Sequence, residues 1–186
     1  RAGVLLGEIP PDDPSLLSLW TPSTGERNTT IMEGVSFGTN GSYSFGMTLR
    51  AEPNQAVIVK PVVTEIDSGS VVTDQVVMSP LSVTFQPTQW NTPQKIQIMA
   101  NSDNTVEGTK LYRISWIMQS ADSSFNEVSE LDSAVRVTVL DADQANITLT
   151  RLSSDIRFTE TGEPVRYSIK LSSLPTANVT LNFAPR

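Results

Sequence analysis

Apolar side chains alternate with polar ones along most of the chain, with a period of two residues. The clearest runs are residues 43–49, 112–118, 135–139 and 165–171. This period puts apolar side chains on one face of an extended strand, whereas a helix would need a period near 3.6. Turn-rich stretches at 102–104 and 120–126 separate the runs. The pattern predicts strands with one buried and one exposed face, and therefore an all-β, antiparallel β-sandwich.

The chain of 186 residues contains neither histidine nor cysteine. This excludes nucleophile pairs that rely on an imidazole base, and zinc, haem or iron–sulfur sites held by those two residue types. A glycosidase would need a pair of carboxylates in a sugar-sized cleft, but the acids here lie mostly in short turns. We therefore expect a protein that is not an enzyme and requires no cofactor.

The balance of charged residues restricts the kinds of partner that the protein can bind. With 13 basic and 20 acidic residues the formal net charge is −7, and the basic residues are scattered singly. Such a surface is unsuited to nucleic acid. No apolar stretch approaches the roughly 20 residues of a membrane helix, so no membrane insertion is expected.

Four N-x-Ser/Thr sequons indicate the compartment. They lie at Asn28, Asn40, Asn146 and Asn178. N-linked glycosylation at such sites is typical of secreted proteins. The sequence thus predicts an extracellular or cell-surface protein with N-linked glycans. The alternative is a Thr-rich β protein whose sequons arose by chance.

The chain also repeats itself, since segment 42–61 is similar to segment 166–185. The matching pairs, each 122 residues apart, are Leu49 with Leu171, Pro53 with Pro175, and Val57 with Val179. A period of this size indicates tandem domains. We expect an extended, Pro-rich segment over 1–29, a complete sandwich over 30–143, and the first part of a second module over 144–186.

One stretch resembles a known family. Residues 81–108, followed by 135–143, look like a Calx-beta module of the extracellular tandem type. The motif consists of Phe85, Pro87, Trp90, Pro93 and Gln94. Residues 30–34 and 158–181 fit the start of the same module. The resemblance implies a seven-stranded, Ig-like sandwich, which commonly serves as a spacer in adhesive or matrix proteins and sometimes binds calcium.

The resemblance also implies candidate calcium ligands. In calcium-binding Calx-beta modules, a glutamate of an early strand, an acidic loop and a final aspartate cluster meet at one end of the sandwich. The matching residues are Glu33, Asp103, Glu107, Asp141 and Asp143, with Asp122 as a weaker addition. Ser102, Asn104 and Ala142 stand where calcium-binding members tend to carry more acid, and fewer acids mean weaker binding. The alternative is that these carboxylates solvate turns and cap loops.

The three tryptophans have different predicted roles. Trp116 lies in an alternating run, so core packing is expected in preference to sugar stacking. Trp90 precedes Pro93 and is expected to fill a corner of the sandwich. Trp20 closes an apolar cluster that begins at Leu16, in an otherwise Pro-rich and acidic segment.

The unfinished second module has three explanations. The chain is a window of a longer tandem array, or a neighbouring copy donates Val4–Leu6 or Leu16–Trp20 by strand addition, or the N-terminal segment folds back within one chain. Donation between copies is head-to-tail and does not close, so it builds filaments.

These observations predict a non-enzymatic, extracellular structural glycoprotein that forms a fibre, stalk or surface array. The alternative is a calcium-binding adhesion or ligand-binding module of a larger surface protein. The two differ in whether self-association or calcium binding is the central property.

Overall fold

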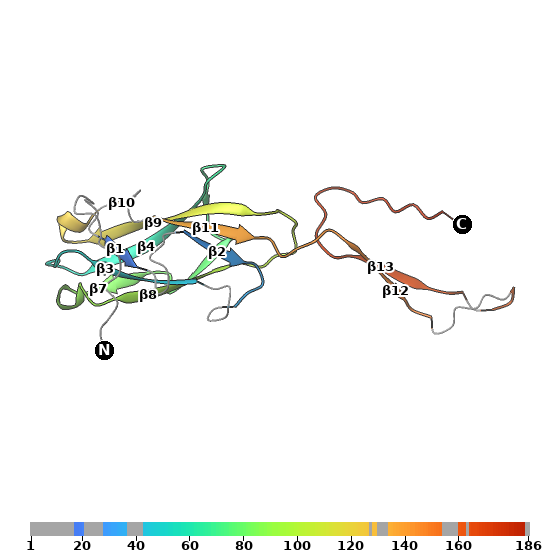
Figure 1. Cartoon of the computed structure of the whole chain (residues 1–186), viewed down its shortest axis with the longest axis horizontal. Coiled ribbons are helices and arrows are strands. Elements are labelled where there is room, and N and C mark those ends of the chain that lie inside the picture. The colour runs from blue at the N-terminus through green and yellow to red at the C-terminus, as the bar shows by residue number, and fades with distance from the viewer. Residues whose placement is uncertain are drawn as a thin grey trace. The chain divides into compact units, whose positions relative to one another are not determined.

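The computed structural model describes residues 17–20, 28–36, 43–126, 128–129, 134–153, 160–162 and 164–184. The chain divides into two compact units, and their positions relative to one another are not determined (Figure 1). The first unit comprises residues 1–102 and 109–140, and the second comprises residues 103–108 and 141–186. We describe each unit by itself.

The first unit is a sandwich of two β-sheets. The smaller sheet has four antiparallel strands in the order β1 (Leu17–Trp20), β3 (Tyr43–Leu49), β8 (Gln94–Ala100) and β6 (Val76–Ser79). The larger sheet has the order β2 (Asn28–Met32), β11 (Val135–Leu140), β9 (Lys110–Ser120), β4 (Val57–Glu65) and β5 (Val71–Val72). Two short strands extend it: β7 (Val83–Phe85) pairs with β4, and β10 (Val128–Ser129) pairs with β9.

The predicted all-β sandwich is confirmed. The described residues contain two short 3₁₀ helices, η1 (Pro87–Gln89) and η2 (Ser123–Phe125), and no α-helix. Accordingly, no helix in this part of the chain has the length and apolar character needed to cross a membrane.

Alternate residues of the two sheets meet in one apolar core. The alternation predicted for 43–49, 112–118 and 135–139 is seen directly in the burial of β3, β9 and β11. Trp116 is fully buried and meets Phe45 edge-to-face, with ring centroids 5.4 Å apart. Trp90 is partly buried and packs against this core, as expected for a corner residue.

The beginning of the chain differs from the prediction in two respects. Residues Leu17–Trp20 pair with β3 of the same unit, with Leu17 opposite Leu49. They therefore complete their own sheet instead of serving as a donated strand. In addition, β2 runs parallel to β11, so the sandwich is not wholly antiparallel. Because β1 and β2 join different sheets, the N-terminal residues contribute to both layers of the first unit.

The second unit contains one hairpin, formed by β12 (Ile147–Arg151) and β13 (Tyr167–Leu171). Both strands are exposed along nearly their whole length. The prediction of a buried face over 165–171 is therefore wrong in this unit, because no second sheet packs on the hairpin among the described residues. Residues 172–184 follow without forming a strand, apart from a single parallel bridge between Thr105 and Leu174.

Candidate functional site

The hairpin of the second unit repeats the β1–β3 pair of the first. Leu17 lies opposite Leu49, and Ile147 lies opposite Leu171. Leu49 and Leu171 are also the residues that the internal repeat aligns. The repeat makes β13 the counterpart of β3, and the register gives β12 the place that β1 has beside it, although Leu17 and Ile147 are 130 residues apart instead of 122.

The counterparts differ sharply in burial. On β3 the side chains of Phe45 and Met47 are 0% exposed. Their counterparts on β13, Tyr167 and Ile169, are 52% and 39% exposed. Apolar residues are thus present at the same positions, but in the second unit the opposing layer that buries them is missing from the described residues.

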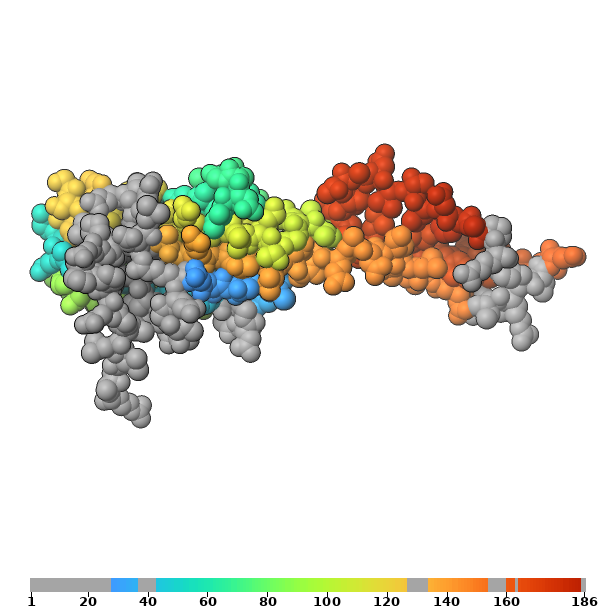
Figure 2. All heavy atoms as spheres, turned by 45° about the horizontal axis from the view of Figure 1, so that its top comes forward, coloured from blue at the N-terminus to red at the C-terminus, as the bar shows by residue number. Residues whose placement is uncertain are grey.

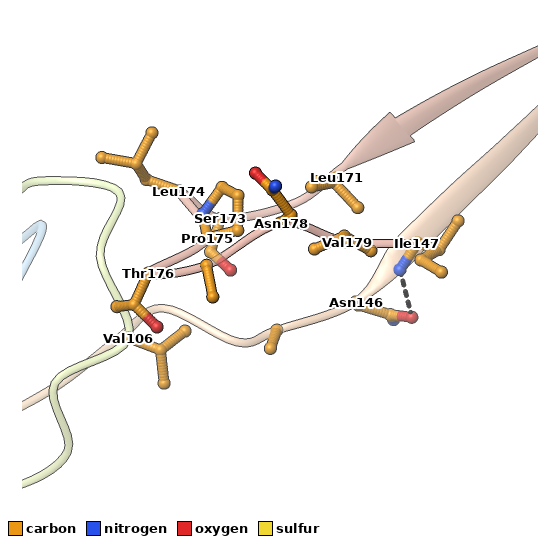
Figure 3. Close-up of a pocket in the computed structure, with 12 residues that line it drawn as sticks. Val106, Asn146, Ile147, Leu171, Ser173, Leu174, Pro175, Thr176, Asn178 and Val179 are labelled. Atoms are coloured by element: carbon orange, nitrogen blue, oxygen red, sulfur yellow. Dashed lines mark hydrogen bonds between the residues drawn. The ribbon is translucent and has the colours of Figure 1, made fainter. Parts of the chain in front are cut away.

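A groove of about 460 Å³ opens beside this hairpin, entirely within the second unit (Figure 3). Its lining includes Leu171, Pro175 and Val179. Their counterparts in the first unit, Leu49, Pro53 and Val57, are all buried. The groove therefore corresponds to the core of a sandwich that is open on one side.

Residues 173–179, close to the C-terminus, form the other wall of the groove. In Figure 2 they are red and lie beside the orange residues of 141–151. Leu174 and Val179 are exposed, and Phe183 is 77% exposed. These residues correspond to β4 and the loop before it, and in the first unit β4 is paired with both β9 and β7. An apolar surface of this kind is characteristic of a binding or assembly site.

A short acidic loop borders the groove. Residues 103–108 carry Val106, which lines the groove, and the carbonyl of Asn104 accepts the N–H of Leu174 at 2.6 Å. The Asp141 carboxylate holds this loop by accepting the N–H groups of Glu107 and Gly108, both at 2.7 Å. It also accepts the N–H of Asp143 at 2.7 Å. Asp141 thus acts as a clamp on the loop.

These three hydrogen bonds change the acidity of Asp141. The N–H of Gly108, followed by those of Asp143 and Glu107, lowers the pKa of the Asp141 carboxyl below its ordinary value of 3.8. Because the folded pKa is the lower one, the bonds stabilise the loop above pH 3.8. That stabilisation is lost as the pH falls through the folded pKa.

Replacing Asp141 by asparagine is expected to release the 103–108 loop. An amide has one acceptor oxygen and no charge, so it cannot accept all three N–H groups as strongly. Hydrogen exchange of the Glu107 and Gly108 amides at neutral pH should accelerate, while exchange in β9 stays unchanged. Asp74→Asn, in an exposed turn of the first unit, is the control. Unchanged exchange at both amides would contradict the clamp.

Of the predicted calcium ligands, the structure brings Asp103 and Asp143 together. Each offers a carboxylate oxygen, and these oxygens lie within 4.8 Å of one another. Asp103 also accepts the N–H of Thr105 at 2.7 Å. Glu107 is exposed, and its N–H is held by Asp141. Two facing carboxylates are a partial set of cation ligands, since calcium takes six to eight oxygens.

Glu33 belongs to the first unit. It is buried, follows β2, and its N–H donates to the Leu140 carbonyl at 3.1 Å. The positions of the two units relative to one another are not determined, so a calcium site shared by Glu33 and the other four acids stays a prediction.

Asp122 does not belong to this group. It caps η2 by accepting the N–H of Ser124 and also accepts the N–H of Asn54, at 2.9 Å. The bond from Asn54, and then that from Ser124, lowers the pKa of the Asp122 carboxyl. It lies beyond the end of β9, whereas Glu33 lies near the other end of the same sandwich. The weaker calcium ligand proposed from the sequence is therefore a loop cap.

Three of the four sequons lie in the described residues, and all three asparagines are exposed. Asn28 begins β2, while Asn146 and Asn178 border the groove (Figure 3). The Asn146 side chain accepts the N–H of Ile147 at 2.8 Å. Asn40 lies outside the described residues. Glycosylation of these sites stays a prediction.

Sequence reasoning did not single out Val106 or Leu174. Both lie in polar, turn-rich surroundings, where one apolar residue carries no periodic signal. The role of Asp141 was also missed, because its two loop partners are 34 and 33 residues away in the chain.

The sequence matches no protein-family model and no curated protein. Solved structures with similar folds include a chain of the chaperone–tip adhesin complex of CFA/I fimbriae, at 12% identity and a TM-score of 0.45. That match covers 74% of this chain and 63% of the other. A chain of the Salmonella enterica SafA pilin–SafB chaperone complex has 10% identity, coverages of 75% and 64%, and a TM-score of 0.43. This chain thus spans less than two thirds of both.

The apo form of the Calx CBD1 domain is also distantly similar, at 16% identity and a TM-score of 0.41. The match covers 69% of this chain and all of that domain. These likenesses are of β-sandwich architecture.

Proposed function

We propose that this protein is a non-enzymatic structural unit of an extracellular fibre, stalk or surface array, assembled head-to-tail. The observation that carries the proposal is the second unit, in which residues equivalent to a buried core line an open groove. An apolar sheet face and an unpaired strand edge favour the addition of a further strand. N-linked glycans on the exposed sequons would coat such an assembly.

The polarity of the first unit supports a head-to-tail arrangement. Leu17 lies opposite Leu49, which precedes the loop that contains Asn54. The N–H of Asn54 donates to the carboxylate of Asp122, which lies just beyond the last residue of β9. Leu140, where the chain leaves this unit, lies next to the start of β9 at Lys110. The eleven residues of β9 span about 36 Å. The first described strand, β1, therefore begins at the end of the first unit opposite to the end at which Leu140 lies.

A calcium-binding adhesion or ligand-binding module is the second candidate. The facing carboxylates of Asp103 and Asp143 favour it, because two acids this close repel unless a cation or solvent compensates them. Asp141 is already engaged by three backbone N–H groups, which makes this candidate the weaker one.

Negative-stain electron microscopy of the full chain, with and without a calcium chelator, tests both candidates. We expect regular filaments whose number rises with protein concentration and which persist in chelator. Filaments that fall apart in chelator would favour calcium as part of the assembly. Monodisperse particles at every concentration would contradict the fibre proposal.

A further inference from the structure

The free edge of β13 is the side at which a further strand would add. Ser172 donates its N–H to Asn146, and Leu152 donates to Arg166, so even-numbered residues of β13 use their backbone groups toward β12. Antiparallel ladders alternate, so the N–H and C=O groups of Tyr167, Ile169 and Leu171 point to the opposite edge. Among the described residues, β12 is the strand paired with β13.

In the first unit this same edge is occupied. The N–H of Leu49, the counterpart of Leu171, donates to the Trp90 carbonyl at 2.9 Å, and β8 then pairs along β3. By contrast, β1 forms the end of its sheet, so the outer edge of its counterpart β12 needs no partner. The repeat therefore indicates that a further strand would pair with the free edge of β13. This strand would be antiparallel and would take the place that β8 has beside β3.

One of the two donor segments suggested by the sequence is not paired in the described structure. Of the two donor segments that the sequence suggested, Leu17–Trp20 is already paired with β3. The other lies within residues 3–9, a run of Gly-Val-Leu-Leu-Gly-Glu-Ile. Residues 10–16 separate it from β1 and contain three prolines, which favour an extended spacer of about 22 Å.

The two segments that would pair carry charges of opposite sign. Residues 3–9 carry one charged side chain, the acidic Glu8. The strand β13 also carries one charged side chain, the basic Lys170. Opposite charges on adjacent strands stabilise pairing, whereas like charges oppose it.

We infer that residues 3–9 of a second copy add as an antiparallel strand to the free edge of β13, in the place that β8 takes in the first unit. This inference rests on the proposed head-to-tail assembly. It adds the identity of the donor segment and of the acceptor edge.

Two variants separate donor from acceptor. A chain lacking residues 1–9 keeps the acceptor edge and loses the donor. Ile169→Pro keeps the donor and removes an N–H from the acceptor edge, because proline cannot donate to the ladder. Leu149→Pro is the matched control, since Leu149 lies opposite Ile169 in the hairpin, with its N–H on the outer edge of β12.

Sedimentation velocity on each variant, and native mass spectrometry of an isotopically labelled mixture, provide the test. We expect the deletion variant and Ile169→Pro each to be monomeric, and their mixture to give a 1:1 dimer and nothing larger. Leu149→Pro should polymerise like the unmodified chain.

The outcomes distinguish the inference from the proposed function. Polymers formed by either defective variant alone, or a mixture that stays monomeric, would overturn the assignment of donor and edge while the unmodified chain still assembles. An unmodified chain that is monomeric at all concentrations would overturn the head-to-tail assembly itself.

Discussion

Replacing Trp116 by alanine should destabilise the first unit by about 3–5 kcal/mol, a large part of the stability of a typical domain. Trp116 is fully buried at the centre of β9, and its ring meets that of Phe45 edge-to-face. The substitution removes the buried ring surface and leaves a cavity that neighbouring strands cannot fill without moving. Urea unfolding followed by far-UV circular dichroism measures the loss.

Trp90→Ala is the control for this change. Trp90 is only partly buried, and its hydrogen bond to Leu49 uses the backbone carbonyl, which alanine retains. We expect a clearly smaller loss of unfolding free energy. Equal losses for the two variants would contradict the central position of Trp116 in the core.

Alanine substitutions at two repeat-equivalent residues should have very different effects. Met47→Ala removes a fully buried side chain from β3 and should cost about 2–5 kcal/mol. Ile169→Ala, at the equivalent position of β13, should change the stability of the isolated chain by less than about 0.5 kcal/mol. The difference arises mainly from burial, since both side chains are apolar and lie on equivalent strands.

Calorimetric unfolding of dilute, unassembled chain measures both effects, with Ser168→Ala as the control for a neighbouring exposed residue. A loss of 2 kcal/mol or more for Ile169→Ala in dilute chain would show that the second unit has a packed core of its own.

Much of the first sandwich was predictable because its strands alternate over long runs. β3, β9 and β11 lie at the predicted places, and their apolar residues face the core. The parallel pairing of β2 with β11 was not predictable, since alternation indicates which face is buried and not which strand is the neighbour. Likewise, β1 has only four residues, too few for its alternation to identify a sheet.

The candidate site was predictable in outline but not in detail. The repeat indicated that residues 166–185 carry apolar side chains at the positions of a buried face, and the structure places several of them on the exposed β13 and in the groove. The acidic residues were recognised by composition, but their roles depend on tertiary contacts. Asp122 caps a turn and Asp141 holds a loop, and neither role leaves a trace in local sequence.

The parallel pairing of β2 and β11 has a mechanical consequence. Five residues from Asn28 to Met32 run alongside Arg136 to Leu140. A pulling force that draws Asn28 backward and Leu140 forward slides these two strands past each other along their length. The ladder bonds, which are evenly spaced in a parallel pair, are then strained together instead of opening one after another. A force applied between Asn28 and Leu140 is thus borne by the whole length of this pair at once.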